Sequence, residues 1–167
     1  LSILKIDSMV VPTVLFGRHP GWGAPGGARV PHETVEGMLA GIEANKLFGQ
    51  TDLVLTGYFA SAQQVIAAAH AIDAVRGAKR KGYGGEAARH PLVIVDPTLG
   101  DAGKGLYVPA EVAKAVIEEL VPRADILAPN VWELAHLTGA DTRTPEEALA
   151  AARLIGKPVL VSSVSHG

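Results

Sequence analysis

The chain has 167 residues, of which 48% are hydrophobic and 19% charged, with a formal net charge of −2. These values predict one domain with a sizeable core, and they argue against a nucleic-acid-binding protein. Because the chain has no cysteine, disulfides and Cys-ligated metal sites are excluded. No apolar run approaches the roughly 20 residues of a membrane span, which argues against a membrane protein. We therefore expect a cytoplasmic location.

Strand-like and helix-like segments alternate along the chain. Apolar, β-branched stretches predict strands at 10–16, 53–58, 92–95, 125–128 and 159–161. Pro12 places the first strand near an edge or bend, and 53–58 reads as a buried strand. Because helices separate the strands, the order predicts a mainly parallel sheet with right-handed crossovers.

Capping signatures predict where three helices begin. They are Ser61 with Gln64, Asn130 with Glu133, and Thr144 with Pro145 and Glu147. A fourth helix is expected between residues 109 and 120, where apolar residues recur at helical spacing.

Polar residues follow the strands of the predicted sheet. Tyr58, Asp96, Asn130 and Ser162 each come after a strand. Since the carboxyl ends of parallel strands meet at one edge, these residues are expected to line a ligand crevice there.

The stretch from Val95 to Pro109 sets two acidic residues, Asp96 and Asp101, in a turn rich in proline and glycine. Such a pair could hold a cation or a phosphate-bound metal. The alternative is that Asp96 caps the turn and Asp101 is simply solvated.

Residues 16–27 are too rich in glycine and proline for a regular helix or strand. They nevertheless carry Arg18, His19 and Trp22, which are suited to stacking on a flat ring and hydrogen-bonding it. This composition favours a flap over a site, the alternative being an ordinary surface loop with one anchoring tryptophan.

Common catalytic fingerprints are missing. No Gly-x-x-x-x-Gly-Lys-Ser/Thr loop, Gly-x-Gly-x-x-Gly turn or Gly-x-Ser-x-Gly elbow occurs, and the six histidines show no metal-ligand spacing.

Taken together, four blocks resemble, in order, the pyridoxal kinases of the ribokinase-like superfamily. They are residues 13–23, 55–58, 96–109 and 124–134. The resemblance implies a three-layer αβα fold with a mainly parallel central sheet, and transfer of the ATP γ-phosphoryl group to the 5′-hydroxyl of pyridoxal.

The same resemblance implies roles for individual residues. Those expected to bind pyridoxal or a related B6 vitamer are His19, Pro20, Gly21, Trp22 and Tyr58. Those expected to bind ATP are Asp96, Tyr107, Ala128, Asn130, Glu133 and Ser162. Mg²⁺ is expected at Asp96, Asp101 and Glu133, and a monovalent cation (K⁺ or Na⁺) could meet the backbone carbonyl of Ala128.

The chain also departs from the family pattern. Gly17, Arg18, His19 and Pro20 stand where the family commonly has Ser-Asn-His-Thr, which puts the side-chain contacts of Arg18 and Pro20 in doubt. We expect residues 1–167 to form a single ribokinase-like domain lacking part of the N-terminal unit and the C-terminal catalytic part. No Gly-Thr-Gly-Asp stretch occurs, so no catalytic residue is assigned and binding is expected to exceed turnover.

Other interpretations stay open. One is a hydroxymethylpyrimidine or sugar kinase of the same superfamily, although Trp22 and Tyr58 favour a flat aromatic substrate over a sugar. Another is a non-catalytic ligand-binding or interaction protein with the same sheet. An exposed edge strand would also suit a homodimer.

Overall fold

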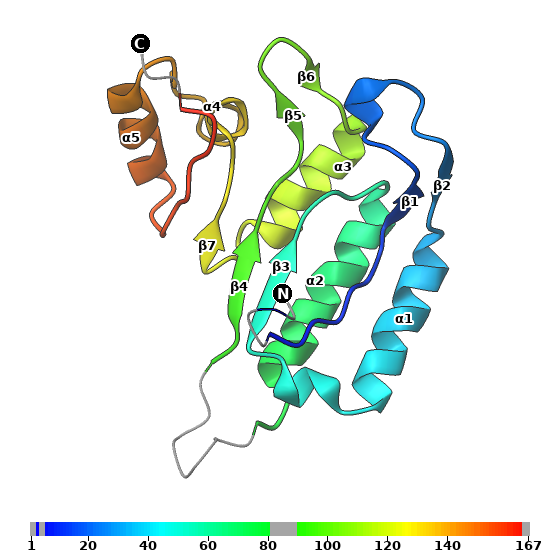
Figure 1. Ribbon diagram of the computed structural model, residues 1–167. Coiled ribbons are helices and arrows are strands. Elements are labelled where there is room, and N and C mark those ends of the chain that lie inside the picture. Colours follow the sequence, from blue (N-terminus) through cyan, green and yellow to red (C-terminus); the bar gives the residue numbers. More distant parts are fainter. Residues whose placement is uncertain (1–2, 4–5, 81–89, 165–167) are drawn as a thin grey trace.

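A computed structural model describes residues 3, 6–80 and 90–164 (Figure 1). Its central sheet contains β3 (Leu53–Thr56), β4 (Leu92–Val95) and β7 (Ile126–Leu127), in the order β3-β4-β7 and with parallel pairing throughout. The expected segment at 159–161 continues the sheet only as an isolated parallel bridge between Leu127 and Val159. The α/β class with a parallel central sheet is therefore confirmed.

Four of the five α-helices lie where they were predicted, three at capping signals and one at the apolar spacing between residues 109 and 120. They are α1 (His32–Ala44), α2 (Ala62–Gly77), α3 (Ala110–Ala115), which continues as a π-helical turn (Val116–Leu120), α4 (Val131–Thr138) and α5 (Pro145–Leu154). Complete capping boxes begin α4 and α5, as predicted. Helix α1 was not predicted because its N-cap, Pro31, offers no side-chain cap.

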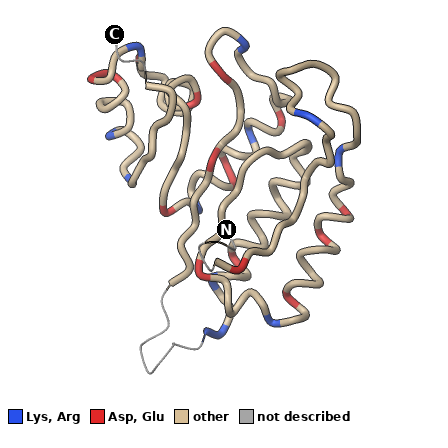
Figure 2. The backbone as a smooth tube through the Cα atoms, in the orientation of Figure 1, with Lys and Arg blue, Asp and Glu red and all other residues tan. Residues whose placement is uncertain are grey.

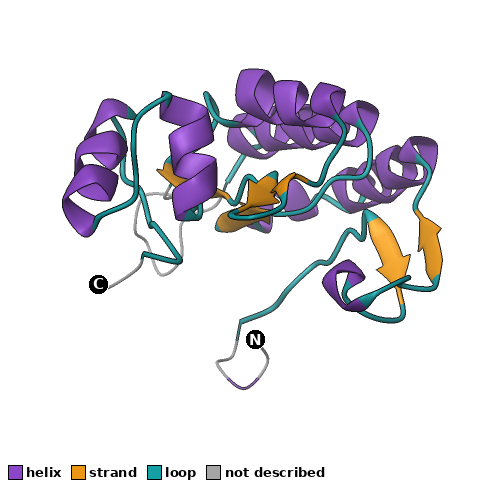
Figure 3. Cartoon of the chain, turned by 90° about the horizontal axis from the view of Figure 1, so that it is seen from above, coloured by secondary structure: helices purple, strands orange, loops and turns teal. Residues whose placement is uncertain are grey.

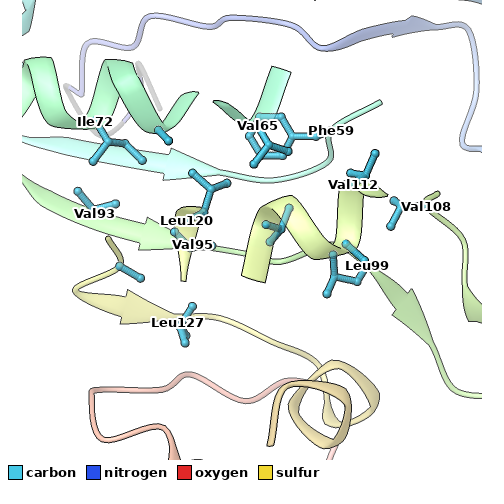
Figure 4. Close-up of a cluster of buried hydrophobic side chains, with 14 residues drawn as sticks. Phe59, Val65, Ile72, Val93, Val95, Leu99, Val108, Val112, Leu120 and Leu127 are labelled. Carbon is cyan, nitrogen blue, oxygen red and sulfur yellow. The ribbon is translucent and has the colours of Figure 1, made fainter. Parts of the chain in front are cut away.

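The core lies between the sheet and helices α2 and α3. Val93, Val95 and Leu127 point to this side, where they pack with residues such as Ile72 and Leu120 (Figure 4). Burial of these side chains is the main force that holds the helices on the sheet.

The opposite face of the sheet corrects one prediction. Leu53 and Leu55 of β3 are 48% and 65% exposed, so the 53–58 strand is buried on one face only. Viewed from above, α2 and α3 lie on a single side of the central strands (Figure 3). Within the described ranges, the second outer layer of the expected three-layer arrangement is not seen.

Two short antiparallel pairs stand outside the central sheet. The predicted strand at 10–16 is reduced to β1 (Val14–Phe16), which pairs with β2 (Gly27–Arg29). The glycine-rich stretch between them contains a 3₁₀ turn at Pro20–Trp22, so it is more regular than predicted. The other pair, β5 (Gly100–Asp101) and β6 (Gly105–Leu106), follows β4. Figure 1 places both pairs toward the carboxyl ends of β3 and β4.

Acidic and basic residues are interspersed along the chain, without a long stretch of one sign (Figure 2). In the part of the chain that the structure describes, no helix is both long and apolar enough to cross a membrane.

Candidate functional site

The loop that follows β4 is shaped by Asp96. Its Oδ1 accepts hydrogen bonds from the backbone N–H of Thr98 (3.1 Å) and from the Thr98 hydroxyl (2.8 Å). Asp96 therefore does cap the turn. Thr98 has a φ of +46°, which is unfavourable for a β-branched residue and costs on the order of 1–3 kcal/mol. Such strain is common at functional sites, so the capping role and a binding role are compatible.

The β5–β6 pair carries Asp101 beyond this turn. Asp101 is exposed, and its Oδ1 accepts from the neighbouring N–H of Ala102 at 2.8 Å. The chain then folds back, because the Tyr107 N–H donates to the carbonyl of Leu99 at 3.0 Å. Tyr107 thereby returns to the loop that Asp96 begins.

Glu133 joins this loop to the start of α4. One carboxylate oxygen accepts from the N–H groups of Leu99 (2.7 Å) and Gly100 (3.4 Å), and the other accepts from Asn130 at 2.9 Å. The Asn130 side chain in turn donates to the carbonyl of Gly100 at 2.8 Å. The predicted ATP-binding blocks around residues 96–109 and 124–134 are thus locked together.

The burial of Glu133 bears on its expected role as a metal ligand. Only 2% of the residue is exposed. Burial, together with the nearby negative charge of Asp96, raises the pKa of Glu133 above its usual value, although hydrogen bonds from three backbone N–H groups act to lower it. A carboxylate has about four lone-pair positions, and three are used here. This environment fits a residue that positions the loop better than one that contacts a cation directly.

The pKa of Tyr107 is raised by its surroundings. Burial, followed by the negative charges of Glu133, Asp96 and Asp101, raises the pKa of Tyr107 to about 12. The carboxylates of Glu133, Asp96 and Asp101 are therefore close enough to Tyr107 to disfavour its ionisation.

Tyr58 reaches the same region from β3. The Thr13 hydroxyl donates to the Tyr58 carbonyl at 2.7 Å, which ties the loop after β3 to the chain that enters β1. A Cβ atom added at Gly57 would lie 3.9 Å from the Thr98 hydroxyl, so the ends of β3 and β4 are adjacent. The Tyr58 side chain is half-buried and packs against the core.

The flap, residues 17–26 between β1 and β2, is exposed but close to the β5–β6 turn. The His19 Nδ1 accepts from the Gly21 N–H at 3.1 Å, and the rings of His19 and Trp22 lie 5.9 Å apart. A Cβ atom added at Gly21 would lie 3.5 Å from the Nζ of Lys104. The flap and the loop from Asp96 to Asp101, called the acidic loop below, therefore lie at the same edge of the sheet.

The end of β7 and the segment that contains Ser162 also lie at this edge. The Ser162 N–H donates to the carbonyl of Pro129 at 3.0 Å, and the Ala128 N–H donates to the carbonyl of Val95 at 2.8 Å. Convergence of the strand ends, which the topology predicted, is confirmed. Thr98 and Lys104 lie within the 96–109 block, but no role was predicted for either of them from the sequence.

The expected crevice is not one of the two best-defined hollows in the part of the chain that the structure describes. The two best-formed hollows, of about 340 and 480 Å³, lie beside α1 and contain none of the predicted site residues. Trp22 is 79% exposed. Among the described residues, no group of three His, Cys, Asp or Glu side chains could hold a metal. The site is an open, polar edge.

Comparison with known proteins agrees with this architecture. Residues 52–164 match a family model described as phosphomethylpyrimidine kinase. The structure is similar to a pyridoxal kinase from Leishmania donovani in complex with ADP and pyridoxine (TM-score 0.86, 26% identity, 99% of this chain and 56% of that one). It is also similar to the pyridoxal kinase from Entamoeba histolytica (TM-score 0.85, 29% identity, 99% and 57%).

The chain belongs to the phosphomethylpyrimidine kinase family, a ribokinase-like group that includes pyridoxal kinases. Among its curated relatives, the pyridoxal kinase of Deinococcus radiodurans is 37% identical over 93% of this chain and 49% of its own length. The pyridoxine/pyridoxal/pyridoxamine kinase of Bordetella avium is 37% identical over 86% and 46%. The chain spans about half the length of these relatives.

Proposed function

We propose that this chain forms part of an ATP-dependent pyridoxal kinase, which transfers the γ-phosphoryl group of ATP to the 5′-hydroxyl of pyridoxal. The observation that carries the proposal is the convergence of the flap, Tyr58, the Asp96–Asp101 loop and the start of α4 at one edge of the sheet. Relatives named as pyridoxal kinases support this assignment, as do similar structures bound to ADP and B6 vitamers.

In this proposal, the flap and Tyr58 hold the pyridine ring. His19 and Trp22 offer aromatic faces and a ring nitrogen, and Tyr58 offers a second aromatic face from the end of β3. Pro20 and Gly21 form the 3₁₀ turn that presents Trp22. A flat, partly polar ring is the ligand that suits these groups.

The nucleotide and Mg²⁺ would meet the acidic loop. Asp96 has one oxygen engaged by Thr98, while Asp101 is exposed, so each can offer oxygen to a hard cation. Two carboxylates suffice because Mg²⁺ usually keeps several waters and binds phosphate oxygens as well. When bound, the ion would neutralise charge on the phosphates.

The other predicted nucleotide-binding residues surround this loop. Tyr107, Asn130 and Ser162 would line the nucleotide, and the carbonyl of Ala128 is the proposed contact for K⁺ or Na⁺. Glu133 enters the proposal as a positioning residue, because its oxygens already accept three backbone N–H groups.

A second candidate is a hydroxymethylpyrimidine kinase, which the description of the matching family model favours. The substrate would again be a flat heteroaromatic ring with a hydroxymethyl group. The two candidates therefore differ in the acceptor and share the nucleotide site.

Calorimetric titration can separate these candidates. We expect pyridoxal to bind at least about tenfold more tightly than hydroxymethylpyrimidine, and Mg·ADP to bind independently of the acceptor. Asp96→Asn should weaken Mg·ADP, whereas Asp141→Asn, an exposed loop change, should not. Preferential binding of the pyrimidine would transfer the assignment to the second candidate. Failure of both acceptors and Mg·ADP to bind would refute the proposed function.

A further inference from the structure

Gln64 is a fully buried amide at the start of α2 that the proposed function does not use. Only 1% of it is exposed. Its backbone N–H donates to the Ser61 hydroxyl at 3.3 Å, but its side chain does not return to close the predicted capping box. Instead, Nε2 donates to the carbonyls of Thr13 (3.1 Å) and Val30 (2.6 Å), and Oε1 accepts from the Ala60 N–H at 2.8 Å.

These three partners belong to two functional segments. Thr13 precedes β1 and Val30 follows β2, so they are the two ends of the hairpin that carries the flap. The Val30 N–H also donates to the Thr13 carbonyl at 3.0 Å. Ala60 lies two residues after Tyr58, whose carbonyl accepts from the Thr13 hydroxyl at 2.7 Å. One side chain thus connects the base of the flap with the loop of Tyr58.

The chemistry of this position suits a neutral primary amide. The site presents two carbonyl acceptors and one N–H donor, and an amide offers two donor hydrogens and an acceptor oxygen. A carboxylate of the same size would place an oxygen against two carbonyls. An apolar side chain would leave all three buried groups without this partner.

We propose that Gln64 is a positioning residue that sets the flap relative to Tyr58 and so fixes the space in which the substrate ring is held. The substrate part of this inference rests on the proposed function. The tip of the flap is exposed at Trp22, so the hydrogen-bonded base is where its orientation is set.

Amide hydrogen exchange of the protein without ligands tests this inference. In Gln64→Glu, amides of residues 14–29 should exchange about tenfold faster, while those of α4 (131–138) should keep their rates. Gln63→Glu is the matched control, because Gln63 is exposed on the same helical turn. If the flap amides keep their exchange rates, Gln64 has no effect on the flap and the inference is overturned. If the amides of the flap and of α4 accelerate equally, Gln64 stabilises the whole fold, and the inference is overturned as well.

A second variant covers the case in which Gln64→Glu does not fold. Gln64→Met keeps the approximate length and volume of the side chain but loses its three hydrogen bonds without burying a charge, and it should also accelerate flap exchange relative to α4. No acceleration would count against the inference. In binding assays, Gln64→Glu should weaken pyridoxal about tenfold and leave Mg·ADP unchanged. If pyridoxal does not bind the unaltered protein, the proposed function fails, while the exchange rates still decide the role of Gln64.

Discussion

The carboxylate of Glu133 accepts the backbone N–H of Leu99 at 2.7 Å, across 34 positions of the chain. This bond joins the turn that Asp96 shapes to the helix that Asn130 caps. The acidic loop and the start of α4 are therefore held in one arrangement before any ligand binds, which reduces the ordering that binding would require.

Replacing Glu133 with Gln should destabilise the fold. The amide –NH₂ group must face one of the backbone N–H groups that the carboxylate now accepts, so we expect the free energy of unfolding at neutral pH to fall by about 1–3 kcal/mol. Urea unfolding measures this change. Glu146→Gln, an exposed change in the first turn of α5, should alter the stability by less than about 0.5 kcal/mol; comparable losses in both variants would refute the role of Glu133.

The difference in stability between the unaltered protein and Glu133→Gln should change with pH in one direction. Because the pKa of Glu133 is raised on folding, its contribution to stability is greatest below the ordinary value of 4.5 and declines as pH rises through the raised pKa. The stability of the unaltered protein relative to Glu133→Gln should therefore decrease with rising pH above about 4.5. A relative stability that increases over this range would show that the pKa is lowered instead.

Tyr107 should titrate abnormally. NMR of ¹³C-labelled tyrosine, assigned with Tyr107→Phe, should give a pKa of about 12. Asp96→Asn and Asp101→Asn should each lower it, although it should stay above 10 because burial is the largest cause. A pKa of 10 in the unaltered protein, insensitive to both substitutions, would mean that the acidic groups lie apart.

Gly100 allows the acidic loop to approach α4. A Cβ atom there would lie 2.3 Å from Trp132 Cζ3 and 2.4 Å from the Gly105 carbonyl oxygen. Gly100→Ala should lower the free energy of unfolding by about 1–3 kcal/mol. Gly77→Ala, at the end of α2 with open space around it, should be neutral or slightly stabilising. Equal effects in thermal unfolding would contradict this packing.

The two faces of the sheet should differ in their response to truncation. Leu127 is fully buried beneath the helices, and Leu127→Ala should cost about 2–5 kcal/mol in urea unfolding. Leu55 is 65% exposed on the other face, so Leu55→Ala should cost less than about 1 kcal/mol. A large loss at Leu55 would show that this face is covered in solution.

Local signals explain what the sequence could predict. The capping boxes at Asn130 and Thr144 involve residues three positions apart, and both are present. The Ser61–Gln64 box forms only in part, because the Gln64 amide bonds to carbonyls 34 and 51 positions away. The prediction of a buried strand at 53–58 was wrong for one face of β3, because an apolar run does not say whether a second layer covers it.

The candidate site, too, could be predicted from the sequence only in part. The topology of parallel strands correctly predicted that Tyr58, Asp96, Asn130 and Ser162 reach one edge. It could not predict that the Glu133 carboxylate would be occupied by the backbone of Leu99 and Gly100, since that depends on how a distant loop folds. The binding roles of these side chains stay predictions.

Paramagnetic relaxation can test directly whether the flap and the acidic loop face one bound substrate. When Mn·ADP is bound in place of Mg·ADP, the paramagnetic Mn²⁺ should sharply increase the relaxation rates of the protons of bound pyridoxal. Replacing both Asp96 and Asp101 with Asn should abolish this increase. If pyridoxal binds the protein but its relaxation is the same with Mn·ADP as with Mg·ADP, the two ligands do not share a site and the kinase assignment is contradicted.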